Sequence, residues 1–103
     1  MNGTLLTLLS PAEMGVSMAD RLRVLRLRKG WTRETLARRA GVSTASLKRF
    51  ETSGKGSLEL VLKIAHALDR LEEFSRILQP PPASTIKELE QQRRQPLPKR
   101  GRR

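Results

Sequence analysis

The chain has 103 residues, with 21 Lys or Arg against 10 Asp or Glu, so its formal net charge at pH 7 is +11. Its length and its hydrophobic content of 37% suit a single small helical core and argue against a second folded domain. The positive charge indicates attraction to polyanions. The absence of cysteine excludes disulfides and thiolate metal sites, which fits a reducing cytoplasm.

Residues 1–17 are expected to form a short N-terminal extension. The apolar run 5–9, LLTLL, is too short for a membrane span and has no basic segment before it, so we expect a soluble, cytoplasmic protein. A capping box at 10–13, with proline at the first helical position, predicts a short helix from Pro11. Gly15 is expected to end or bend this helix.

A longer helix is predicted over residues 18–29, with Ser17 as its N-cap and Gly30 as its stop. The spacing of its apolar residues places three of them on one buried stripe: Met18, Leu22 and Leu25.

Val24 and Leu27 fall off this stripe, on a flank that needs a cover. Two covers are possible. Residues 5–16 fold back over this flank, or a second subunit or another protein covers it. We treat Val24 and Leu27 as a candidate partner interface.

The stretch 32–52, TRETLARRAGVSTASLKRFET, predicts two short helices joined by a tight turn. Thr32 and Ser43 are suited to cap the two helices, and Gly41 to adopt the left-handed conformation between them. The apolar positions define one face on each side of the turn: Leu36, Ala37, Ala40, Val42, Leu47 and Phe50. This pattern is typical of a DNA-reading helix-turn-helix. The alternative is a plain pair of helices in a bundle with a solvated basic face.

A loop at 53–57 follows, in which Lys55 and backbone N–H groups are placed to approach a phosphate. Ser57 is expected to cap a core helix. One face of that helix is predicted to carry Leu58, Val61, Leu62, Ala65 and Leu68, with Ile64 beside it. A last amphipathic turn or two is predicted from Leu71, Phe74, Ile77 and Leu78. The prolines at 80–82 end the helical part, so the predicted domain spans 18–79.

Residues 80–103 form a proline-containing basic tail, expected to be partly disordered. A second capping box at 85–88 predicts a short helix to about Arg94, which is marginal alone. Residues 81–103 hold seven Lys or Arg against two Glu. The tail is therefore either a second electrostatic arm for DNA or a solvated end.

Residues 22–78 resemble the Cro/cI (XRE) helix-turn-helix repressors. The residues at the family's spacing are Leu36-Ala37, Ala40-Gly41-Val42-Ser43, Leu47, Glu51, Leu58, Leu62-Lys63-Ile64-Ala65 and Leu68. The resemblance implies an all-α, five-helix fold and a buried ion pair between Arg26 and Glu51. Burying either charge alone costs several kcal/mol.

The same resemblance implies the DNA contacts. The residues facing base edges are Thr44, Ala45 and Arg49. Those near phosphates are Arg33, Ser43, Ser46 and Lys48, to which Lys55 of the loop is added. Arg33 stands where the family often has glutamine, which adds a charge. Ala45 replaces a longer polar residue, which leaves the base preference there open.

The five-helix core with its proline break and basic tail also resembles small HipB-like antitoxins. That resemblance implies an autoregulating repressor that accompanies a HipA-like kinase toxin. Because the reading surface is small, we expect the protein to bind an inverted repeat as a homodimer. The alternatives are a stand-alone XRE regulator and a protein adaptor that has lost DNA binding.

Other functional classes fit the sequence poorly. His66, the only histidine, falls on an outward helix side, and no hydrolase elbow, phosphate loop or paired carboxylates occur. We therefore expect no enzyme activity, cofactor or metal. An aromatic content of 3% is too low for a stacking RNA binder, and no continuous amphipathic basic helix suggests a membrane binder.

Overall fold

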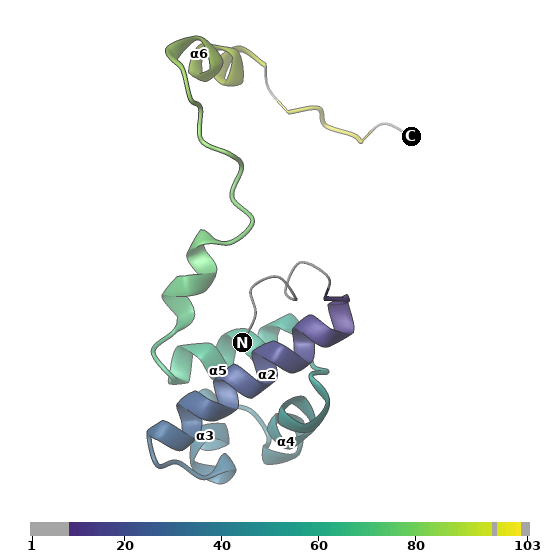
Figure 1. Ribbon diagram of the computed structural model, residues 1–103, viewed down its shortest axis with the longest axis vertical. Helices are drawn as coiled ribbons and strands as arrows, with labels where there is room; N and C mark the ends of the chain where they lie inside the picture. The colour runs from purple at the N-terminus through teal and green to yellow at the C-terminus, as the bar shows by residue number, and fades with distance from the viewer. Residues whose placement is uncertain (1–8, 96, 102–103) are drawn as a thin grey trace.

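The computed structural model describes residues 9–95 and 97–101, and within them every regular element is a helix (Figure 1). The all-α prediction is therefore confirmed. The elements, in chain order, are α2 (Pro11–Arg28), α3 (Arg33–Ala40), α4 (Thr44–Ser53), α5 (Leu58–Ala67), the 3-10 helix η1 (Leu71–Arg76) and α6 (Ile86–Arg94).

Helix α2 is continuous, and the prediction of two helices divided near Gly15 was wrong. It begins at the predicted capping box, where the Ser10 hydroxyl accepts a hydrogen bond from the Glu13 N–H at 3.1 Å. Gly15 and Ser17 both lie inside the helix. A single glycine costs a helix about 1 kcal/mol and does not by itself end it. The predicted stop is correct, because Gly30 follows the helix with a φ of 73°.

This continuity also removes one predicted cover for Val24. Residues 11–16 form the first turns of α2 itself, so they do not fold back over the later turns. Residues 5–8, which completed the predicted cover, lie outside the described residues.

The helix-turn-helix geometry follows the predicted local signals. The Thr32 hydroxyl accepts from the Thr35 N–H at 3.1 Å, and the Ser43 hydroxyl accepts from the Ser46 N–H at 3.0 Å. Gly41, with a φ of 71°, ends α3 in the left-handed conformation. Two capped helices therefore meet at a sharp turn, as the motif predicts.

The hydrophobic core joins helices α2, α3, α4 and α5. Its members are Ala19, Leu22, Leu36, Ala37, Leu47, Phe50, Val61, Ile64, Ala65 and Leu68. Within the predicted stripe of α2, Leu22 is buried, whereas Met18 and Leu25 are half-buried and pack at the edge. Packing of α4 on α2 and of α3 on α5 holds the two helices of the motif in place.

Helix α5 presents a different face to the core from the one predicted. Ser57 caps it as expected, through a 3.1 Å bond from the Leu60 N–H. Leu58, however, is 67% exposed, and Leu62 is only half-buried. At 100° per residue the buried positions centre between Val61 and Ile64, which turns Leu58 and Leu62 onto a flank.

The predicted amphipathic end of the domain is also different. Helix α5 stops at Ala67, and Asp69 adopts a φ of 61°, so the stripe of α5 does not continue. The 3-10 helix η1 packs only Phe74 against the core. Ile77 and Leu78 are exposed, the latter at 96%.

Helix α6 stands apart from the globular part, beyond an extended segment that contains the three prolines (Figure 1). The Thr85 hydroxyl accepts from the Glu88 N–H at 3.1 Å, as predicted. The Glu88 carboxylate binds the Ser84 N–H and hydroxyl instead of completing the capping box. These hydrogen bonds outweigh the small effect of burial and lower the pKa of Glu88.

Candidate nucleic-acid interface

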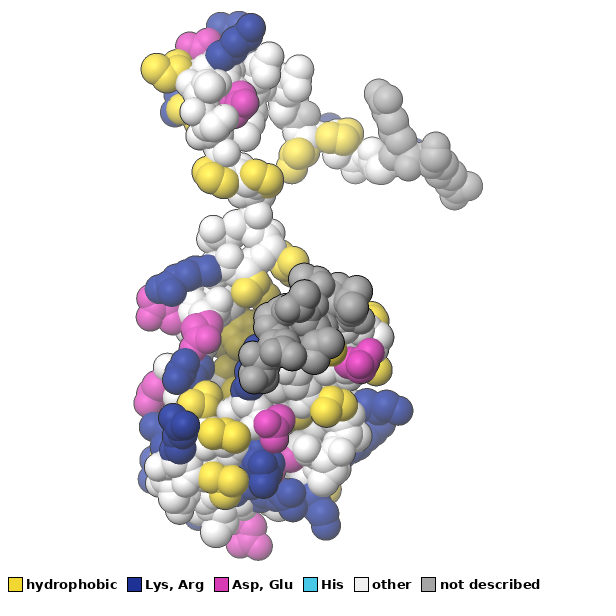
Figure 2. Space-filling view, viewed as in Figure 1, with side chains coloured by type: hydrophobic (Ala, Val, Ile, Leu, Met, Phe, Trp, Pro, Cys, Tyr) yellow, Lys and Arg dark blue, Asp and Glu magenta, His cyan; other side chains and the backbone are white. Residues whose placement is uncertain are grey.

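Helix α4 is anchored on one side and open on the other. Leu47 and Phe50 are buried in the core at 0% and 2% exposure. The remaining side chains of its first turns are exposed: Thr44, Ala45, Ser46, Lys48 and Arg49. Lys and Arg side chains are spread over the globular part around it (Figure 2). The exposed face is small, polar or basic, as entry into a major groove requires.

A hollow of about 310 Å³ lies where the first turns of α4 and α5 meet the loop between them. Ser43 and Ser46 line it from α4, and Lys55 and Ser57 from the loop and the start of α5. Helix N-termini carry partial positive charge and unpaired N–H groups, so both helix starts favour an anion there. Arg49 also lines this hollow.

Two residues that line this hollow, Glu59 and Lys63, were given no role at the site from the sequence. Lys63 and Glu59 line it from α5, one turn apart, and their Nζ and Oε1 atoms lie 3.6 Å apart. The sequence feature that could have indicated them is the cap at Ser57. A helix that begins at Ser57, directly after the loop with Lys55, places the residues of its first turns beside that loop.

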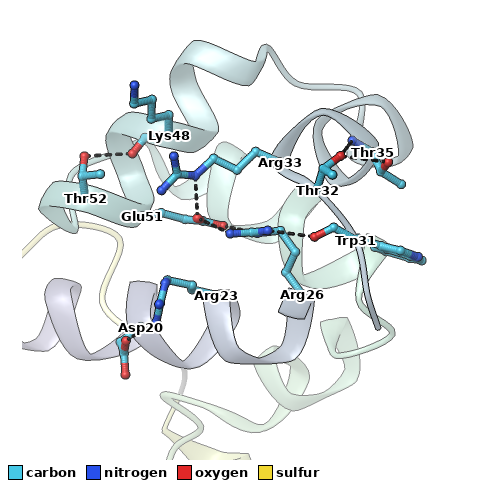
Figure 3. Close-up of polar contacts among 10 residues, drawn as sticks. All are labelled: Asp20, Arg23, Arg26, Trp31, Thr32, Arg33, Thr35, Lys48, Glu51 and Thr52. Carbon is cyan, nitrogen blue, oxygen red and sulfur yellow. Dashed lines mark hydrogen bonds and ion pairs between the residues drawn. The ribbon is translucent and has the colours of Figure 1, made fainter. Parts of the chain in front are cut away.

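An ion pair between Arg26 and Glu51 ties α2 to the end of α4 (Figure 3). Arg26 Nε lies 2.8 Å from Glu51 Oε2, and Arg26 Nη2 lies 2.9 Å from Oε1. The remaining nitrogen, Nη1, donates to the Trp31 carbonyl oxygen at 2.8 Å. Both ionic side chains are buried, at 8% and 1% exposure. The paired guanidinium and carboxylate therefore satisfy one another inside the fold.

The pKa of Glu51 reflects this environment. Burial alone raises the pKa of a carboxyl, but the hydrogen bonds and positive charges of Arg26 and Arg33 outweigh burial and lower the pKa of Glu51. Glu51 therefore remains ionised in the fold at neutral pH.

Arg33, predicted to contact phosphate, is placed on Glu51 in the structure. Its Nε donates to Glu51 Oε1 at 2.9 Å, while its side chain remains 34% exposed at the start of α3 (Figure 3). Arg33 therefore links the first turn of α3 to the end of α4. A phosphate contact by Arg33 remains a prediction.

Trp31 has a role that sequence reasoning missed. The Arg39 guanidinium carbon lies 4.5 Å from the centroid of its ring, and Lys29 Nζ lies 5.1 Å from it. The ring also packs half-buried on the core. Cation–π contacts and the bond from Arg26 therefore fix the residue that precedes the cap of α3.

The other predicted candidates lie elsewhere. Val24 is half-buried beside a hollow of about 410 Å³ that Phe74 also lines, whereas Leu27 is 50% exposed and does not line it. His66 is exposed on α5. Within residues 9–95 and 97–101, no three His, Cys, Asp or Glu side chains gather as metal ligands would.

No helix in the described part of the chain combines the length and apolar character needed to cross a membrane.

Comparison with known families agrees with this geometry. The family model described as a helix-turn-helix domain matches residues 17–74. No curated protein and no solved structure matches the chain.

Proposed function

The chain belongs to the helix-turn-helix domain family of DNA-binding regulators, and we propose that it is a sequence-specific repressor that reads operator DNA with α4. One observation carries the proposal. The exposed face of α4 is held by buried Leu47 and Phe50 and by the Glu51 ion pair, so its small and basic side chains are presented on a rigid support.

Base recognition is assigned to Thr44, Ala45 and Arg49. All three are exposed on the first turns of α4, the part of a recognition helix that meets base edges. Arg49 has the fork of donors that fits O6 and N7 of a guanine. Ala45 offers a methyl group, which suits contact with a thymine methyl.

Phosphate recognition is assigned to the residues around the hollow at the starts of α4 and α5. Ser43 and Ser46 lie at one helix start, and Lys55 lies in the loop before the other. Lys48 is exposed on α4, and Arg33 keeps a third of its side chain exposed at the start of α3. Such contacts set register and affinity and leave base choice to α4.

The cellular role that we propose is that of an autoregulating antitoxin encoded with a HipA-like kinase toxin, bound as a homodimer to an inverted repeat. The resemblance of the tail to HipB-like antitoxins motivates this role. The exposed Leu27 and the half-buried Val24 supply a candidate contact surface for the toxin. The alternative role is that of a stand-alone XRE regulator that has no toxin partner.

The test is binding-site selection followed by titration of the selected DNA. Arg49→Ala should weaken binding to the selected site by about 1–3 kcal/mol and relax the preference at one base pair. Arg23→Ala is the matched control, because Arg23 is exposed on α2 and pairs with Asp20 at the surface. Equal affinity of the wild-type protein for selected and scrambled DNA would refute sequence-specific reading.

A further inference from the structure

We propose that two copies of the chain associate through an apolar stripe on the outer flank of α5 and the start of η1, formed by Leu58, Leu62 and Leu71. This inference rests on the proposed function and deepens it, because a repressor of an inverted repeat needs a surface that holds two reading helices on one side of the DNA.

The stripe is exposed and contiguous. Leu58 is 67% exposed and Leu71 39%, and Leu62 is half-buried. The three leucines line one shallow depression of about 540 Å³, to which Ala40 adds a further apolar wall. Leu58 and Leu62 are four residues apart, so they lie on a single side of α5. Exposed leucines gathered at one depression make this flank a candidate interaction site.

The charges beside the stripe suit a second copy of the same chain. Glu59 and Lys63 border the depression, with side chains 80% and 47% exposed. In an antiparallel two-fold contact centred near residue 61, Glu59 of each copy faces Lys63 of the other. The surface is therefore complementary to itself, as a two-fold interface must be.

The position of the stripe also favours a second copy. Glu59 and Lys63 line both this depression and the hollow where phosphate contacts are proposed. A two-fold contact along α5 therefore brings the two phosphate-binding hollows next to each other. The flank at Val24 is less suited to self-association, because its hollow is lined by Arg21, Arg28 and Arg70 against two acidic residues.

Crosslinking of full-length chains tests the contact directly, because the sequence has no cysteine. Leu62→Cys should give covalent dimers with a short bis-maleimide, in free protein or on operator DNA. Leu27→Cys is the control, being an exposed leucine on α2. Crosslinking of Leu27→Cys and not of Leu62→Cys would move the interface to α2 and overturn the proposal, as would no crosslinking of either.

A charge exchange tests the predicted register. Glu59→Lys should raise the dimer dissociation constant at least tenfold in sedimentation equilibrium, because four positive charges then meet. The double variant Glu59→Lys with Lys63→Glu should restore dimerisation, since the reciprocal pairs reform. If Glu59→Lys has no effect, or the double variant fails to recover, the proposed pairing is wrong.

Operator binding separates this proposal from the proposed function. Leu58→Glu should bind a single half-site as the wild-type protein does, but should lose cooperative binding to two half-sites. Unchanged cooperativity overturns the interface and leaves DNA reading intact. Failure of the wild-type protein to prefer any sequence refutes the function itself.

Discussion

Gly15 and Gly54 lie in backbone contact, so a Cβ atom on Gly15 would stand 2.7 Å from the Gly54 carbonyl oxygen. The second turn of α2 thereby touches the residue that ends α4 in the left-handed conformation, with a φ of 73°. Residues 11–16, which extend α2, therefore support the C-terminal end of α4. They also adjoin the loop that carries Lys55.

We expect Gly15→Ala to lower the free energy of unfolding by about 1–3 kcal/mol, the usual cost of overpacking. Helix propensity alone would instead raise the free energy of unfolding of Gly15→Ala, by about 0.5–1 kcal/mol. Urea denaturation distinguishes the two. Gly101→Ala is the control, because nothing lies within 4 Å of that added carbon. A stabilised Gly15→Ala protein would contradict the contact.

Glu51→Gln should lower the free energy of unfolding by about 3–5 kcal/mol, because it leaves the buried Arg26 guanidinium without its carboxylate. Asp20→Asn is the control. Its carboxylate pairs with Arg23 at the surface, where the expected loss is about 0–1 kcal/mol. Similar losses for the two variants, measured by denaturation at pH 7, would refute a buried, stabilising role for Glu51.

The pKa of Glu51 gives a test in acid. Its pKa is lower in the folded than in the unfolded protein, so its contribution to stability is present above the unfolded value, about 4.3. That contribution is lost as pH falls from there through the folded pKa. The difference in stability between wild-type protein and Glu51→Gln should therefore shrink below about pH 4. A difference that stays constant to pH 2 would contradict the lowered pKa.

Deletion of residues 83–103 should reduce the salt dependence of operator binding if the tail touches phosphate. The slope of log K against log salt is negative, and each phosphate that the shortened protein no longer neutralises should reduce its magnitude by about 0.9. Fluorescence anisotropy of labelled operator between low and physiological salt measures the slope. If the slope is unchanged and toxin binding disappears, the tail serves as an interaction arm.

Local signals in the sequence predicted the helix-turn-helix because they depend on neighbouring residues only. A serine or threonine cap binds an N–H three residues ahead, as at Thr32, Ser43 and Ser57, and Gly41 needs only its own left-handed backbone. Gly15 was wrongly predicted to stop the helix. A glycine is needed at this position because of a close contact with Gly54, thirty-nine residues away, which the local sequence does not reveal.

The limits of the site prediction have a similar cause. The spacing of Leu58 fits a core position, but the rotation of α5 is set by packing against α3. Trp31 was missed because its partner Arg39 lies in the next helix, and the hollow that Lys63 lines with Ser43 forms only when α4 and α5 pack together. The exposed character of Thr44, Ala45 and Arg49 was predictable, whereas their contacts with bases stay predictions.

Two guanidinium groups share the Glu51 carboxylate, and this unequal ratio has an electrostatic consequence. Arg26 and Arg33 bring two positive charges to one negative charge, so the cluster keeps a surplus of one positive charge. The more exposed of the two cations, Arg33, stands at the start of α3, where the helix dipole adds to that surplus. A phosphate bound by Arg33 at the start of α3 would therefore bring the cluster of Arg26, Arg33 and Glu51 to neutrality.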